Sequence, residues 1–161
     1  MSDLLDIISK ESTVIFTAML PLVEVRAAIP VGIALGMAPI HATILAYIGS
    51  IIPSPFILWL IRPIFSYLRK TKLFKKLVNK LTKRTMEKAT NVQKYGYIGL
   101  FIFVAIPLPG TGVWSGSLIA ALLDMRIKYA FPTIAIGNII ASIAIMLLSF
   151  GLVNINSFPI F

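Results

Sequence analysis

The chain has 161 residues, of which 58% are hydrophobic, and it carries a formal net charge of +9. Soluble domains are about 45–50% apolar, so this composition favours one integral membrane domain covering residues 1–161. With no cysteine and one histidine, the chain lacks the usual ligands of a metal centre and any Cys/His or Ser/His/Asp catalytic set. We therefore expect no metal, no cofactor and no enzymatic activity.

Residues 1–12 lack the basic region and the small-residue cleavage site of a secretory signal peptide. Their leucines and isoleucines form one apolar stripe. We expect them to form a short helix that lies at the membrane interface.

The first apolar stretch, residues 13–37, contains Glu24 and Arg26 between Pro21 and Pro30. A charge at the bilayer centre costs about 2.5–3.5 kcal/mol on insertion scales. We expect this stretch to be a broken hairpin, extended between the prolines so that both charges point into one watery pocket. Two interpretations follow. Either Glu24 takes up protons or cations while Arg26 holds an anionic group, or the two form an ion pair that pins one hairpin to the other.

Residues 39–61 form the second apolar stretch, long enough to cross a bilayer. The segment that follows, 62–94, holds most of the cations, and a leucine recurs every fourth residue at 73, 77 and 81. Beside apolar spans this charge indicates a cytoplasmic segment rather than a nucleic-acid site. We expect a basic amphipathic helix that rests on anionic lipid headgroups at 69–88.

The third apolar stretch, 96–123, is interrupted by a turn sequence that cannot continue a helix. The residues of interest are Pro107, Pro109, Gly110, Thr111, Gly112, Trp114 and Ser115. We expect a helix to resume after Gly112 with Thr111 or Ser115 as its N-cap and with free N–H groups that suit an anion. The alternative is that these residues only turn the hairpin, while Gly112, Gly116 and Ala120 let helices pack closely. Trp114 is also a candidate interfacial anchor.

The fourth stretch, 127–153, repeats the second. When Met37 is aligned with Met125, eight of the 22 residue pairs from Met37/Met125 to Leu58/Met146 are identical. Asn138 then falls on Ser50, and we expect these polar residues to hydrogen-bond across the spans. Each repeat (13–61 and 96–153) would be a broken hairpin followed by a spanning helix.

The fold class that follows is an all-α membrane protein of two inverted repeats, each with a re-entrant hairpin. In this arrangement only 39–61 and 127–153 cross, both termini lie outside, and Arg126 and Lys128 lie on the basic side. In the alternative, all four stretches cross and the repeats are parallel. Inverted repeats with broken helices that meet near the midplane are a recurring transporter plan.

Two motifs carry a resemblance to a known family. Glu24-Val-Arg26-Ala-Ala-Ile-Pro30-Val-Gly32 and the stretch from Ala105 to Ala120 resemble the small multidrug export family of prokaryotic membrane proteins. That family is distantly similar to the DedA/VTT proteins, which share paired re-entrant hairpins and are implicated in lipid translocation. The DedA-like arginine after Pro-Gly is absent, since Thr111 follows Gly110.

The resemblance implies a transporter in a prokaryotic inner membrane, crossing it more than once. We expect a secondary exporter of amphipathic small molecules, with Glu24 as a proton-coupled acid and Arg26 as its partner. A DedA-like flippase for lipids or lipid-phosphate carriers and a non-transporting scaffold are the alternatives. Two spans enclose little volume, so a homodimer is expected in each case.

Overall fold

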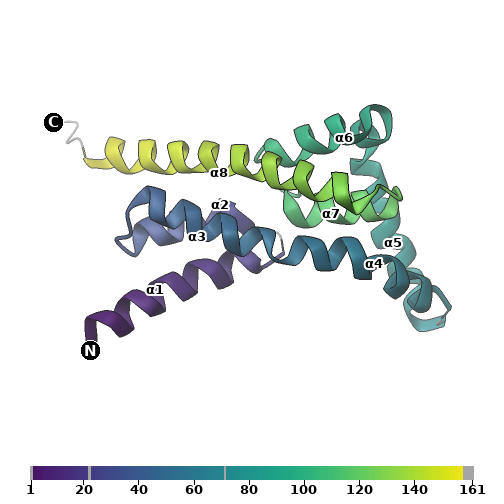
Figure 1. Ribbon diagram of the computed structural model, residues 1–161, viewed down its shortest axis with the longest axis horizontal. Coiled ribbons are helices and arrows are strands. Elements are labelled where there is room, and N and C mark those ends of the chain that lie inside the picture. Colours follow the sequence, from purple (N-terminus) through teal and green to yellow (C-terminus); the bar gives the residue numbers. More distant parts are fainter. Residues whose placement is uncertain (1, 22, 71, 158–161) are drawn as a thin grey trace.

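The computed structural model describes residues 2–21, 23–70 and 72–157, and within these ranges the chain is helical without strands. The all-helical prediction is therefore confirmed. The helices in these ranges (Figure 1) are α1 (Ser2–Met19), α2 (Glu24–Ala34), α3 (Pro39–Ile51), α4 (Pro53–Lys70), α5 (Lys72–Lys88), α6 (Thr90–Ala105), α7 (Val113–Leu122) and α8 (Ile127–Ser157).

Two helical hairpins approach each other from opposite ends of the molecule. In Figure 1, α1 runs inward from the end that holds both termini and α2 returns toward it. From the other end, α6 runs inward and α7 returns. The two tips, one after Met19 and one after Ala105, meet in the middle of the molecule, where hydrogen bonds join them.

Two helical segments are long and apolar enough to cross a bilayer, namely Pro39–Ile61 with 23 residues and Ile127–Gly151 with 25. The first consists of α3 and the start of α4, with the junction at Pro53, whose ring nitrogen has no N–H to donate. The second lies within α8, which runs in the opposite direction (Figure 1). They correspond to the two stretches expected to cross.

The N-terminal helix differs from the prediction. In place of a short helix over residues 1–12 and a separate segment from 13, α1 continues unbroken from Ser2 to Met19. No proline or glycine occurs before Pro21, so nothing in the sequence stops the helix. Val14 and Ala18 of α1 are fully buried, and they hold its second half against α2 and α3.

The same local structure recurs at an offset of 88 residues. The last residue of α2, Ala34, is 88 residues before the last residue of α7, Leu122. The first residue of α3, Pro39, is likewise 88 residues before the first residue of α8, Ile127. Three backbone hydrogen bonds end α2, and the same three recur at the end of α7. At α2 the N–H groups of Leu35, Gly36 and Met37 donate to the carbonyls of Val31, Ile33 and Gly32. At α7 the donors are Leu123, Asp124 and Met125. Gly36 and Asp124 both have a positive φ, of 82° and 56°. The sequence repeat thus extends to the backbone conformation of both turns.

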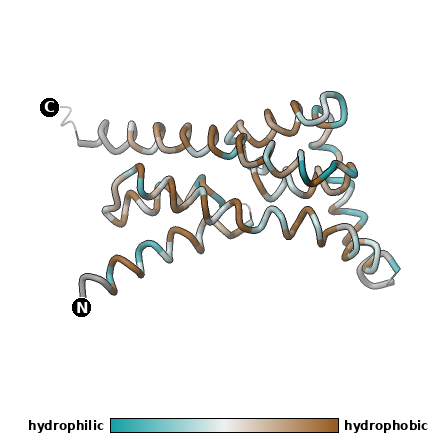
Figure 2. The backbone as a smooth tube through the Cα atoms, viewed as in Figure 1, coloured by the Kyte–Doolittle hydropathy of each residue, from teal (hydrophilic) through white to brown (hydrophobic). Residues whose placement is uncertain are grey.

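Packing divides into two apolar clusters, one around each hairpin. The first includes Val14, Val25 and Ile29, and the second includes Leu100 and Ile119. Around them, large apolar side chains are exposed along the outside of the helices, while hydrophilic residues gather near α5 and the start of α6 (Figure 2). An apolar exterior of this extent suits lipid rather than water.

The basic segment contains helix α5, as predicted, but its inward face differs. Val78 is buried, whereas Leu77 and Leu81 are 53% and 42% exposed. The side chain of Leu73 lies outside the described side chains. The face toward the protein is therefore formed by Val78 and Met86, two turns apart, and the leucines point away from it.

Candidate functional site

The tip of the first hairpin places Glu24 in an unusual backbone conformation. Glu24 is the first residue of α2 and has a φ of 48°, in the left-handed region. Non-glycine residues occupy this region rarely, and such positions gather at functional sites. The Glu24 side chain is 2% exposed, so this carboxylate is removed from solvent and needs partners.

The tip of the second hairpin is a compact turn that ends at Gly112, the N-cap of α7. The N–H of Leu108 bonds to the Ile106 carbonyl at 2.8 Å, and that of Thr111 to the Leu108 carbonyl at 3.1 Å. Gly112 has φ 111° and ψ −163°, a combination that is essentially restricted to glycine. The turn therefore aims the first N–H groups of α7 at the other hairpin.

Glu24 caps α7 from the opposite hairpin. Its Oε1 accepts the N–H of Trp114 at 2.8 Å, and its Oε2 accepts the N–H of Val113 at 3.2 Å. N–H groups in the first turn of a helix have no intrahelical partner, and the positive end of the helix dipole favours an anion. A Cβ at Gly112 would overlap this carboxylate, so the approach depends on glycine.

Arg26 binds the same turn. Its two terminal nitrogens donate to Thr111, Nη1 to the carbonyl at 2.8 Å and Nη2 to Oγ1 at 2.7 Å. Nη1 also lies 3.8 Å from Oε2 of Glu24, so the two charges form an ion pair. The Nε of Arg26 is buried and has no hydrogen-bond partner among the described residues.

Two further contacts hold the tips together. The indole N–H of Trp114 donates to the carbonyl of Met19, the last residue of α1, at 3.1 Å. Trp114 therefore joins the two hairpins. On the other side, Nζ of Lys88 on α5 lies 3.4 Å from the carbonyl oxygen of Gly110. Neither partner was predicted, since a backbone carbonyl and one lysine among many carry no distinguishing signal.

Three expectations about the tips were wrong. Residues 24–34 form a helix and are not extended; Glu24 and Arg26 reach the same turn because the positive φ of Glu24 redirects the start of α2. Neither Thr111 nor Ser115 caps α7. The N–H groups of Val113 and Trp114 are not free, because Glu24 occupies them.

The other predicted site residues do not bond to Glu24 or Arg26 among the described contacts. Pro107 and Pro109 belong to the turn of the second hairpin, and Ser115 lies in the first turn of α7. Pro30 lies inside α2, where it has no N–H to donate to the Arg26 carbonyl. Asn138 belongs to α8 and bonds elsewhere.

Buried polar side chains join α8 to α3 and α4 to α7. Nδ2 of Asn138 donates to Oγ of Ser50 at 2.7 Å, as the repeat predicted. Ser54 and Ser117 share a hydrogen bond of 2.8 Å between their hydroxyls, and Ser142 donates to the Asn138 carbonyl at 2.7 Å. Oδ1 of Asn138 is buried without a partner among the described residues.

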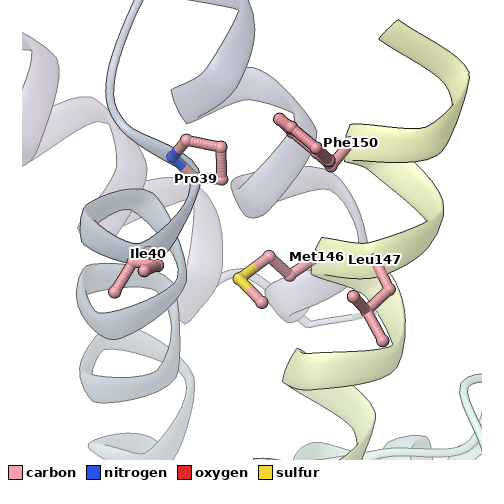
Figure 3. Close-up of a pocket in the computed structure, with 5 residues that line it drawn as sticks. All are labelled: Pro39, Ile40, Met146, Leu147 and Phe150. Atoms are coloured by element: carbon pink, nitrogen blue, oxygen red, sulfur yellow. The ribbon is translucent and has the colours of Figure 1, made fainter. Parts of the chain in front are cut away.

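An apolar hollow of about 310 Å³ separates the start of α3 from the far part of α8 (Figure 3). It is lined by Pro39, Ile40, Met146, Leu147 and Phe150. None of these lining residues has an ionisable side chain. Within the described residues, no group of three or more His, Asp or Glu side chains is placed to hold a metal ion.

Comparison with known proteins gives one match. The model of the family described as "Putative small multi-drug export protein" matches residues 24–144. This range begins at Glu24 and contains Arg26, the turn of the second hairpin and Asn138. A search of curated proteins and a search of solved structures found no significant match.

Proposed function

The chain belongs to the small multi-drug export family, and we propose that it is a proton-coupled secondary exporter of amphipathic small molecules. The observation that carries the proposal is the buried contact of Glu24 with the N-terminus of α7. It places a titratable group where the two hairpins meet. Ionisable residues at membrane depth mark substrate or ion pathways by default.

The contact suggests how protons and opening would be linked. Ionised Glu24 accepts two N–H bonds and pairs with Arg26, which holds the tips together. Protonation removes the charge, so the dipole and ion-pair attractions weaken and the tips separate. Arg26 is then released from its carboxylate and is available to an anionic group on the substrate, toward which the unpartnered Nε contributes a further donor.

The helix lengths support a re-entrant, inverted arrangement. With 11 and 10 residues, α2 and α7 are each about 15–16 Å long, against a hydrocarbon core of about 30 Å. They would enter and return without crossing, one hairpin from each side. In this proposal the protein lies in the prokaryotic inner membrane as a multi-pass homodimer, with the hairpins alternately opening toward each side.

The test is flux in liposomes that contain the purified protein. A fluorescent amphipathic probe that carries an anionic group should move in response to an imposed pH gradient, and Glu24→Gln should lose that response because Gln keeps the shape but cannot titrate. Glu11→Gln is the matched control: it also removes one negative charge, but from the exposed His41 contact on α1. It should retain the response.

Other outcomes identify the alternatives. Movement of lipid or lipid-phosphate probes that does not depend on the pH gradient would favour a DedA-like flippase. The feature that supports this alternative is the pair of Arg26 nitrogens that donate to Thr111. Absence of flux of both probe classes, with a folded protein, would favour a scaffold in which the Glu24–Arg26 pair only fastens the hairpins.

A further inference from the structure

A second polar pocket lies between α5 and α7, beside the hairpin tips. Its volume is about 80 Å³, room for a group the size of a phosphate. The lining residues are Leu81, Arg84, Thr85, Lys88, Ser115 and Ile119. Four of these six offer hydrogen-bond donors and none is acidic, so the pocket is built for an anion.

The donors are available. Within the described part of the chain, no hydrogen bond or ion pair engages the side chains of Arg84, Thr85 or Ser115. Lys88 touches the Gly110 carbonyl at 3.4 Å, beyond the usual range for such a bond, so an anion would compete for it easily. Arg84 and Lys88 are four residues apart and therefore face the same way from α5.

The pocket combines apolar and polar lining residues. Leu81 and Ile119 supply an apolar wall, while the cations and hydroxyls supply the polar one. Arginine and lysine with hydroxyl donors are the groups that proteins use to bind phosphate oxygens. We propose that this pocket binds a phosphate group, carried either by an anionic lipid headgroup or by a free phosphate ion. Binding does not require transport, so the proposal can be tested apart from the proposed function.

Three variants separate a built site from general attraction to a basic helix. Arg84→Gln removes a lining cation. Lys83→Gln removes the same charge from the next residue, which is exposed and outside the pocket. Ser115→Leu leaves every charge in place but fills the space. Size exclusion and thermal unfolding establish that each variant is folded.

The first probe is inorganic phosphate, titrated calorimetrically into protein in nanodiscs of neutral phosphatidylcholine. The second is phosphatidic acid, mixed into the discs and scored by its retention on the protein in native mass spectrometry. We expect at least one probe to bind saturably, Arg84→Gln and Ser115→Leu to weaken it about tenfold or more, and Lys83→Gln to change it less than about twofold.

The pattern identifies the source of the phosphate. If the free ion binds equally in neutral and mixed discs, the ligand is soluble; if phosphatidic acid displaces the ion, or alone is retained, the ligand is a lipid headgroup. Absence of saturable binding by both probes overturns the proposal. So does an equal effect of Arg84→Gln and Lys83→Gln, or unchanged binding in a folded Ser115→Leu protein.

Discussion

At the scale of single residues, the contact between the hairpins depends on a cap that is not local. Helix N-caps are ordinarily Ser, Thr, Asp or Asn at the start of the same helix. Here the cap is Gly112, which contributes no side chain, and Glu24, 88 residues earlier in the chain, supplies the carboxylate. Gly112 is needed both for its backbone angles and for the space that Glu24 occupies.

Gly112→Ala should therefore damage both stability and transport. The new Cβ meets the Glu24 carboxylate, and the backbone angles alone cost about 1–3 kcal/mol for a residue with a side chain. Gly36→Ala is the control: φ there is 82°, but nothing lies within 4 Å of an added Cβ. Thermal unfolding in detergent should show a small loss for Gly36→Ala and a clearly larger one for Gly112→Ala. Equal losses would mean that the Glu24 contact contributes little.

Sequence reasoning could identify Glu24 and Arg26, because charges inside an apolar run are costly and need a reason. It could also identify the turn from its prolines and glycines. It could not pair them. Tertiary contacts determine where α2 starts and why Glu24 has a positive φ. They also bring this distant carboxylate to the free N–H groups at the start of α7. None of these features has a local signature in the sequence. The N-cap prediction failed for this reason, since it searched only the residues next to the helix.

At the scale of helices, the repeat places equivalent positions in contact. Ser50 and Asn138 differ by the repeat offset of 88 and are hydrogen-bonded to each other, which is the contact expected on an axis that relates two repeats. Ser50 also donates to the Tyr47 carbonyl, so its hydroxyl both donates and accepts. The bond joins α3 to α8, the helices whose apolar segments are long enough to span.

A double-mutant cycle of Ser50→Ala and Asn138→Ala should show coupling. The expected energy is about 0.6 kcal/mol, the average for hydrogen bonds between membrane helices, with about 1.7 as an upper bound. Thr43→Ala and Thr133→Ala form the control cycle, because each hydroxyl donates to a carbonyl of its own helix. Unfolding in mixed detergent measures both. A coupling no larger than that of the control would deny the bond a role in joining the spans.

The helical elements were largely predictable. The two long spans follow from runs of apolar residues, and the recurring turn follows from the sequence repeat. The end of the N-terminal helix was predicted wrongly because apolar periodicity does not reveal where a helix ends when no breaker is present. On α5, periodicity found the leucine stripe but not the inward face, which the packing of Val78 determines.

At the scale of the whole molecule, the two halves share a sequence repeat and a turn conformation but differ in chemistry. The position equivalent to Glu24 is Gly112, and the position equivalent to Arg26 is Trp114. One hairpin thus supplies the charges and the other supplies a helix terminus to receive them. Such an asymmetric contact suits the proposed release on protonation, whereas two identical tips would offer no such pairing.

The last prediction concerns the side of the membrane on which equivalent positions of the two halves lie. Ala38 and Arg126 are equivalent positions, 88 residues apart, each just before a long helix and each exposed. The native chain has no cysteine, so a single cysteine at either position reports its own location without a background. If the repeats are inverted, the two positions lie on opposite sides of the membrane. An impermeant thiol reagent applied to intact cells should then label Ala38→Cys and should label Arg126→Cys only after permeabilisation.

Lys83→Cys, exposed on α5, marks the side of the basic segment and should behave like Arg126→Cys. Parallel repeats with four crossings would instead place Ala38 and Arg126 on the same side, and both would react in intact cells while Lys83→Cys would not. That outcome would require α2 and α7 to cross a bilayer about twice their length. The proposed inverted arrangement avoids this mismatch, because each short helix would reach only the middle of the membrane and Glu24 would meet α7 there.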